Sequence, residues 1–375
     1  MISINSALLA DNYKIGHYFQ YPKNTTLVYS NMTPRKSRVE GSEEIVFFGL
    51  QYFIKHILQE RFQRDFFDLP LADVLSSFKR ATDNMLGKDA IPTDHIEALH
   101  KKQYLPICIK ALPEGTICPI GVPCLTIYNT LPEFFWLTNF LETILSCEVW
   151  MPCTSATTSY RYRKVLNKWA NLTKGNTDGV QWQGHDFSMR SHSSLESAMV
   201  SGAAHLLSFT GSDTVPALHF LEHYYNADSD KELILGSVAA SEHSVMCAGT
   251  REDERETYRR LIEDVYPDGV VSLVSDTWSL FDVITQILPS LKETILKRNG
   301  TVVIRPDTSP KTPLEIICGD PEGETEEERK GVVELLWDIF GGTVNELGYK
   351  VLDSHIGTLY GEAISVELSD KICAK

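Results

Sequence analysis

Charged side chains follow five apolar segments in the second half of the chain, each where a segment ends. In chain order they are Asp213 after 206–209, His243 after 233–238, Asp276 after 270–274, Arg305 and Asp307 after 301–304, and Glu362 after 356–360 and Gly361. If these segments are parallel strands, their carboxyl ends meet at one edge, and we expect the side chains to surround a single site. Helix capping is the alternative for the acids, but it does not account for His243 or Arg305.

An aromatic and an arginine lie just upstream, in the segment GHDFSMRS at 184–191, as Phe187 and Arg190. Together with the carboxylates, they suit a planar ligand beside a phosphorylated sugar. The aromatic would stack on the ring, the arginines would bind phosphate or carbonyl oxygens, and the carboxylates would contact hydroxyls and Mg²⁺. The sequence has no GxGxxG or GxxxxGK[ST] loop and no Ser-His-Asp elbow, so hydrolase, dinucleotide and P-loop functions lack support.

The elements that position these residues are predicted to alternate between strand and helix. Strands are expected at 181–187, 206–209, 233–238, 270–274, 301–304 and 356–360, and helices at 193–205, 214–225, 239–248, 251–265, 279–297 and 326–340. This alternation predicts parallel βα units and an α/β fold, specifically an irregular (β/α) barrel of parallel strands. Six strands are few for closing such a barrel, so we expect an incomplete one.

The first part of the chain has a different pattern, which predicts an N-terminal α+β domain at 1–150 before a catalytic α/β-barrel domain at 151–375. Residues 43–58 carry apolar side chains on a helical period and predict a buried helix. Residues 110–128 are rich in strand formers broken by Pro and Gly turns. Two further helices are expected, from Pro132 to Ser146 and over 154–172.

Two clusters in the N-terminal domain each allow two interpretations. Tyr13 lies in the aromatic-rich segment DNYKIGHYFQYP, which is either a terminal segment packed on the core or part of a binding site. Arg35 lies in the basic loop PRKSR, which either binds phosphates or is simply solvated.

Composition excludes several classes of partner. The formal net charge of −15 over 375 residues argues against nucleic acid and against an anionic membrane surface. No apolar run approaches the length of a membrane span and the first residues lack the features of a signal peptide, so we expect a cytoplasmic protein. The eight cysteines form no CxxC motif and no zinc-like pairing with histidine, and are expected to be reduced thiols.

Several segments also resemble the nicotinamide phosphoribosyltransferases, a family of type II phosphoribosyltransferases that has the nicotinate enzymes as relatives. The resemblance extends over essentially the whole chain, in order. It is carried by DNYKIGHYFQYP, VFFGLQYF, LPEFFWLTNFLETIL, GHDFSMRS, GAAHLLSFTGSDT, AASEHS, VSDTW and VVIRPDTSP.

The resemblance implies how the base would be held. Phe187 would stack on one face of nicotinamide and the partner subunit's Tyr13 on the other, which implies a homodimer with shared sites. Asp213 would accept a hydrogen bond from the carboxamide NH₂, Arg305 would lie toward the carboxamide oxygen, and Arg190 would help position base and phosphate. A carboxylate at Asp213 accepts hydrogen bonds only, which favours nicotinamide over nicotinate.

The resemblance further implies the reaction, in which the pyridine nitrogen displaces pyrophosphate from 5-phosphoribosyl 1-pyrophosphate to give nicotinamide mononucleotide. Arg35 would contact phosphates, and Asp276 and Asp307 would act near the ribose hydroxyls or Mg²⁺, with Asp307 the candidate metal ligand. His243 corresponds to the histidine that is phosphorylated when ATP hydrolysis is coupled to synthesis. Because the pyridine nitrogen is already nucleophilic, catalysis would depend on alignment and charge stabilisation.

The sequence departs from the family pattern in two places. The family has Gly-Asp where this chain has Gly361-Glu362, and family members continue beyond Lys375 into a glycine-rich phosphate-binding loop and a C-terminal segment. We therefore expect a shortened or split form. Two alternatives follow from the sequence: a weakly active or inactive homologue that binds a ligand or serves as a partner subunit, and an enzyme that uses nicotinate.

Overall fold

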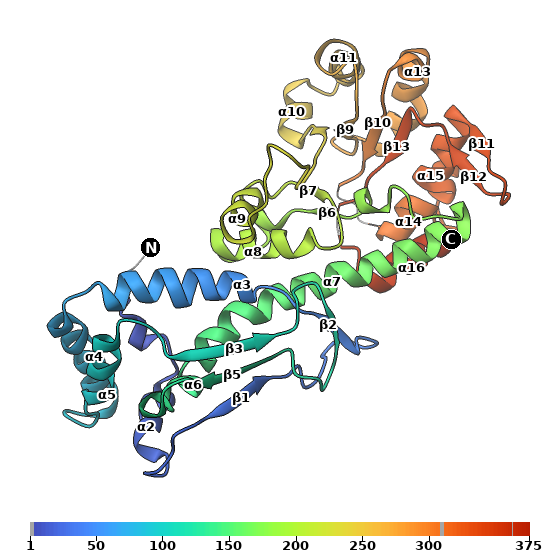
Figure 1. Cartoon of the computed structure of the whole chain (residues 1–375). Helices are drawn as coiled ribbons and strands as arrows, with labels where there is room; N and C mark the ends of the chain where they lie inside the picture. Colours follow the sequence, from blue (N-terminus) through green and yellow to red (C-terminus); the bar gives the residue numbers. More distant parts are fainter. Residues whose placement is uncertain (1–3, 308–310, 362) are drawn as a thin grey trace. The chain divides into compact units, whose positions relative to one another are not determined.

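The computed structural model describes residues 4–307, 311–361 and 363–375. The chain divides into two compact units, and each unit is formed by two separate segments of the sequence (Figure 1). Unit 1 consists of Met1–Tyr160 and His185–Leu235, and unit 2 of Arg161–Gly184 and Gly236–Lys375. The predicted domain boundary near residue 150 lies within one long helix, α7 (Glu142–Lys174). Within the described residues, no helix combines the length and the apolar character needed to cross a membrane.

Unit 1 contains a three-stranded antiparallel sheet and a group of helices around an aromatic core. The sheet has the order β1 (Tyr29–Met32), β5 (Leu125–Asn129), β3 (Ile107–Ala111), and a second antiparallel pair joins β2 (Glu44–Val46) to β4 (Ile117–Pro119). The strands β3, β4 and β5 confirm the β-rich prediction for 110–128. The helical elements are α1 (Asn12–Ile15), α2 (His17–Gln20), α3 (Leu50–Tyr52), η2 (Phe53–Arg61), η3 (Gln63–Phe67), α4 (Leu71–Leu86), α5 (Asp94–Lys102) and α6 (Leu137–Phe140).

The predicted helix over 43–58 is wrong at its start, because residues 44–46 form β2 and the helix begins only at Leu50. Gly49 separates the two elements with a φ of 100°, and a Cβ at this position would lie 2.5 Å from Cγ of Pro152. A side chain is therefore excluded at this turn by both backbone conformation and space. From Leu50 on, the apolar period does place Phe53, Ile57 and their neighbours in the core, as predicted.

The remaining part of unit 1 holds a short parallel pair and two helices. Strand β6 (His185–Asp186) pairs in parallel with β7 (Gly211–Ser212). Helix α8 (Leu195–His205) begins at the N-cap Ser194, whose hydroxyl accepts a hydrogen bond from the Ser197 N–H, and α9 (Pro216–Tyr225) follows β7. Gly202 of α8 allows close packing here, since a Cβ would lie 2.9 Å from Thr214 Cγ2.

Unit 2 is built on a four-stranded parallel sheet with the order β13 (Ile356–Thr358), β10 (Val302–Arg305), β9 (Val271–Val274), β8 (Ala239–Ala240). The apolar side chains of β9 and β10 are buried against helices on the flanks of this sheet (Figure 1). The helical elements are α10 (His243–Ala248), α11 (Glu254–Arg260), η7 (Leu261–Val265), α12 (Leu280–Asp282), η8 (Val283–Ile287), α13 (Leu288–Lys297), α14 (Pro313–Cys318), α15 (Glu326–Phe340) and α16 (Val366–Ala374). An antiparallel hairpin joins β11 (Gly342–Val344) to β12 (Lys350–Leu352).

The mixed α/β fold with parallel strands is confirmed, and β9, β10 and β13 lie close to where they were predicted. Two of the predicted strands are wrong: 206–209 is the turn after α8, and 233–238 precedes the actual strand β8. The predicted 181–187 strand is reduced to the two residues of β6. Closure of the parallel strands into a barrel stays a prediction.

Candidate active-site residues

The sheet of unit 2 brings three predicted site residues together, which we call the histidine–carboxylate group: His243, Asp276 and Asp307. His243 is the first residue of α10, shortly after β8, while Asp276 and Asp307 each lie two residues beyond the ends of β9 and β10. Because β8, β9 and β10 are parallel neighbours, their carboxyl ends open at one edge of the sheet. The predicted convergence of polar residues at such an edge is therefore present within this unit.

Asp276 is the fixed member of the histidine–carboxylate group. Its side chain is 7% exposed, its Oδ1 lies 3.3 Å from His243 Nε2, and its Oδ2 accepts a 2.8 Å hydrogen bond from the Asp307 backbone N–H. The other ring nitrogen of His243, Nδ1, lies 3.8 Å from Asp307 Oδ2. His243 is 41% exposed and thus open to a reactant, while the buried carboxylate sets the orientation of its ring.

Arg305 ends β10 beside this group and donates a 2.8 Å hydrogen bond from Nη2 to the Ser241 carbonyl oxygen. Its Nε is buried and has no hydrogen-bond partner among the described residues. Gly361 is exposed, and a Cβ at this position would lie 3.4 Å from Asp307 Oδ1, so the backbone there passes close to the carboxylate. Glu362 lies outside the described residues.

The parallel pair β6–β7 of unit 1 carries a second set of residues, which we call the ring group: the predicted Phe187, Arg190 and Asp213, together with His185. The Asp213 backbone N–H donates a 2.9 Å hydrogen bond to the Asp186 carbonyl oxygen, which continues the β6–β7 pairing. His185 Nε2 lies 3.1 Å from Asp213 Oδ1, and the rings of His185 and Phe187 have centroids 5.2 Å apart.

The guanidinium of Arg190 lies 5.0 Å from the centroid of the Phe187 ring. Phe187 is half-buried and Arg190 is exposed. This arrangement presents an aromatic face beside a cation and a carboxylate, which suits a flat polar ring that carries both hydrogen-bond donors and acceptors.

Asp186 is buried among hydroxyl groups and holds the ring group in place. Its carboxylate accepts hydrogen bonds from Ser188 at 2.6 Å, from Ser212 at 3.3 Å and from Thr214. Ser188 follows β6, whereas Ser212 lies in β7 and Thr214 follows it. One carboxylate therefore links the segments that carry Phe187 and Asp213. Asp186 also lines an open pocket of about 190 Å³ with Thr154, Ser155, Thr158, Ser159, Ser201 and His205.

Tyr13 and Arg35 lie on other elements of unit 1. Tyr13 belongs to α1, and its side chain is 60% exposed. Arg35 is exposed in the loop after β1. Their predicted contributions, to a second subunit and to phosphate binding, stay predictions.

Sequence reasoning missed His185 and Asp186 as functional candidates, although both stand in the segment that it singled out. Their contacts depend on the pairing of β6 with β7, and neither two-residue strand has an apolar pattern. The sequence offered one local signal. Asp186 is followed two residues later by Ser188, a possible hydrogen-bond partner, in a segment that ends a predicted strand.

The described residues contain no group of three or more His, Cys, Asp or Glu side chains able to hold a metal ion by themselves. Mg²⁺ is usually held by one or two carboxylates together with substrate phosphates, and a dedicated protein cage is not required. Asp307, 29% exposed, fits such a role as a single carboxylate ligand.

Comparison with known proteins gives a consistent result. Residues 182–375 match the model of the nicotinate phosphoribosyltransferase family, and residues 5–64 match that of the N-terminal domain of nicotinamide phosphoribosyltransferase. The nicotinamide phosphoribosyltransferase of Acinetobacter baylyi is 46% identical over 98% of this chain and 74% of its own length. That of Mycoplasma pneumoniae is 35% identical over 96% of this chain and 79% of its own length.

Two solved structures share the fold at low identity. Human nicotinic acid phosphoribosyltransferase aligns with a TM-score of 0.52 at 18% identity, over 80% of this chain and 61% of its own. Nicotinate-nucleotide pyrophosphorylase from Pyrococcus furiosus aligns with a TM-score of 0.57 at 13% identity, over 99% of this chain and 69% of its own.

Proposed function

Because the chain belongs to the nicotinamide phosphoribosyltransferase family, we propose that it transfers the phosphoribosyl group of 5-phosphoribosyl 1-pyrophosphate to nicotinamide. The products are nicotinamide mononucleotide and pyrophosphate, which makes the reaction a pentosyl transfer of NAD salvage. The observation that carries this proposal is the 46% identity to the A. baylyi enzyme over 98% of the chain.

The ring group is assigned to the base. Phe187 offers a half-buried aromatic face, and the Asp213 carboxylate, beside His185, accepts a hydrogen bond from the carboxamide NH₂. An acceptor-only carboxylate repels the carboxylate of nicotinate, which supports nicotinamide as the preferred base. Arg190 assists in positioning the base and the phosphate.

The histidine–carboxylate group is assigned to the sugar and to the leaving pyrophosphate. The pyridine nitrogen needs no general base, so the barrier lies in the cationic sugar and the departing polyanion. Asp276 and Asp307 would stabilise the positive charge that develops on the ribose ring, or orient its hydroxyls. Mg²⁺, with Asp307 as one ligand, would neutralise charge on the pyrophosphate.

His243 is assigned to ATP coupling. Its ring is exposed on one side and is oriented by Asp276, so one nitrogen can accept a phosphoryl group while ADP leaves. The exposed Tyr13 supports a homodimer in which the partner subunit's Tyr13 completes the base site.

The direct test is pyrophosphate release by the purified chain with 5-phosphoribosyl 1-pyrophosphate, Mg²⁺ and nicotinamide, each with and without ATP. The proposal predicts equimolar pyrophosphate and nicotinamide mononucleotide. It also predicts that ATP raises the yield in the wild type but not in His243→Ala. A chain that forms no mononucleotide at any Mg²⁺ or ATP concentration would contradict the proposal and favour a ligand-binding or partner-subunit role.

A further inference from the structure

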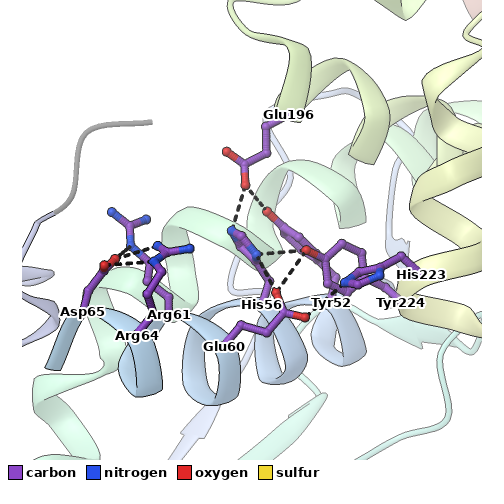
Figure 2. Close-up of polar contacts among 9 residues, drawn as sticks. All are labelled: Tyr52, His56, Glu60, Arg61, Arg64, Asp65, Glu196, His223 and Tyr224. Carbon is purple, nitrogen blue, oxygen red and sulfur yellow. Dashed lines mark hydrogen bonds and ion pairs between the residues drawn. The ribbon is translucent and has the colours of Figure 1, made fainter. Parts of the chain in front are cut away.

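A second polar cluster lies in unit 1 outside the ring group, and we call it the His56 clasp: Tyr52, His56, Glu60, Glu196 and Tyr224 (Figure 2). His56 lies on η2 and is 8% exposed. Its Nε2 is 3.0 Å from Glu196 Oε1 on α8, and its Nδ1 is 3.3 Å from Glu60 Oε2 and 2.9 Å from the Tyr224 hydroxyl on α9. The clasp thus joins residues of α3, η2, α8 and α9 around one buried histidine.

The geometry of the clasp suits a protonated ring. Carboxylate oxygens lie within 3.3 Å of both nitrogens of His56; the Nε2–Glu196 approach is an ion pair by distance without hydrogen-bond geometry, and both approaches favour the positively charged imidazolium. The Glu196 contact raises the pKa of His56 above its ordinary value, and His56 in turn is the main cause that lowers the pKa of Glu196 to about 2. Tyr52 adds a 2.6 Å hydrogen bond from its hydroxyl to Glu196.

Other charged groups near His56 come from three elements. Glu148 of α7 is partly buried, and burial followed by the charge of Glu196 raises its pKa. Arg61, on the same helix as His56, contributes positive charge that lowers the pKa of Glu196. On α9, His223 lies 3.1 Å from Glu60 at the exposed edge of the clasp. Carboxylates therefore outnumber the permanent cation around His56, which favours its charged form.

Helix α8 connects the clasp to the ring group. Glu196 lies in its first turn, two residues after the N-cap Ser194, and Ser201 lies further along it. The Ser188 hydroxyl donates its proton to Asp186, and its oxygen lies 3.2 Å from the Ser201 hydroxyl, which can donate to it. Ser188 stands between Phe187 and Arg190 in the short helix η6 (Ser188–Arg190), which packs against α8.

We propose that His56 is a positioning residue for nicotinamide binding. In its protonated form it holds Glu196 and thereby α8, and α8 holds the segment that carries Phe187 and Arg190. The inference rests on the proposed function, since it assigns the clasp to the base-binding residues of that same reaction.

The pH dependence has a definite sign. The pKa of His56 is raised in the folded state, so the clasp is complete below the ordinary histidine pKa and weakens as the pH rises through the raised value. The KM for nicotinamide should therefore increase with pH, while kcat changes little, because the clasp acts on binding and touches no reacting atom.

The experiment compares wild type with His56→Gln, His56→Lys and a matched control across neutral and alkaline pH. The control is His219→Gln, an exposed histidine of α9 that pairs with Glu222 outside the clasp. We expect His56→Gln to raise the KM for nicotinamide about fivefold to tenfold at the lower pH values and to remove its pH dependence, consistent with loss of one charge-assisted contact. His56→Lys, which keeps a positive charge, should hold a low KM over the whole range. His219→Gln should behave like the wild type.

Thermal unfolding separates this inference from the proposed function. The melting temperature of His56→Gln should lie furthest below that of the wild type at low pH, and the difference should shrink as the pH rises. A constant difference, or a His56→Gln enzyme whose KM equals the wild-type value at every pH, overturns the inference. If the wild type neither turns over nor binds nicotinamide, the proposed function and the positioning role are both wrong. The melting temperatures measured across the pH range still decide whether the clasp depends on protonation of His56.

Discussion

The two groups of candidate active-site residues are positioned by different forces. In unit 2 the histidine–carboxylate group follows strands of a sheet with a buried apolar core, in which Leu273, Val302 and Ile304 are all at 0% exposure. In unit 1 the ring group rests on strands of only two residues, and the hydroxyl contacts of Asp186 hold it. Strands held by apolar packing tolerate polar substitutions at their ends, whereas a buried hydrogen-bonded network is destabilised when one partner is removed.

This difference predicts opposite outcomes for conservative changes of two buried aspartates. Asp276→Asn should lower kcat/KM about 100-fold to 1000-fold, because the charge facing the reacting sugar is lost. It should leave the melting temperature nearly unchanged, since β9 and β10 pack without it. Steady-state kinetics and thermal unfolding of the variant test both halves, with Asp264→Asn, a surface acid of the same unit paired with Arg259, as the control. A loss of less than tenfold would remove Asp276 from the chemistry.

In unit 1, Asp186→Asn should act mainly on binding and stability. The amide has one acceptor oxygen in place of two, so hydroxyl donors around it lose their partners, at a cost of about 1–3 kcal/mol. We expect the melting temperature to fall by roughly 3–8 °C and the KM for nicotinamide to rise about tenfold, with a smaller change in kcat. Asp228→Asn, which alters an exposed ion pair with Lys231 in the same unit, is the control. A variant with normal KM and stability would contradict the role of Asp186.

A smaller effect is expected at Glu254 in unit 2, a glutamate whose pKa shifts in the opposite direction to that of Glu196 in unit 1. Glu254 is 6% exposed, and burial followed by the charge of Asp282 raises its pKa to about 7. The folded state therefore holds this proton more tightly than the unfolded state. The contribution of Glu254 to the free energy of unfolding falls as the pH rises from the ordinary glutamate value to about 7, and this contribution is constant above that.

Glu254→Gln should abolish this slope and stabilise the protein by roughly 2 kcal/mol above neutral pH. Denaturant unfolding of the variant and the wild type at acidic and alkaline pH measures the difference. Equal free energies of unfolding for Glu254→Gln and the wild type at alkaline pH would contradict this prediction. They would show that the ionised Glu254 carboxylate does not destabilise the folded state.

The same contrast explains what the sequence could predict. Strands β9 and β10 were predicted closely because each is mostly a run of apolar residues between turns, and β13 starts where the apolar segment 356–360 was predicted. The apolar run at 206–209 instead continues the end of α8, where Phe209 stacks on His205 with ring centroids 5.1 Å apart. The actual strand, Gly211–Ser212, carries no apolar side chain to reveal it.

The candidate residues were chosen because they follow predicted strand ends or stand in segments that resemble the family, and their roles stay predictions. Asp186 and His56 were not, since their importance lies in partners distant in sequence, such as Thr214 and Glu196. A polar residue gives a sequence signal only when its partner is local, as at the capping box Ser194–Ser197.

The most direct test of the account is a competition between labelled nicotinamide and nicotinate for one pool of 5-phosphoribosyl 1-pyrophosphate, with wild type and Asp213→Asn. We predict that the wild type forms almost only nicotinamide mononucleotide, and that Asp213→Asn, whose amide can also donate, lowers the preference about tenfold or more. A wild type that prefers nicotinate, or an unchanged preference in the variant, would contradict the assignment of the ring group to base recognition.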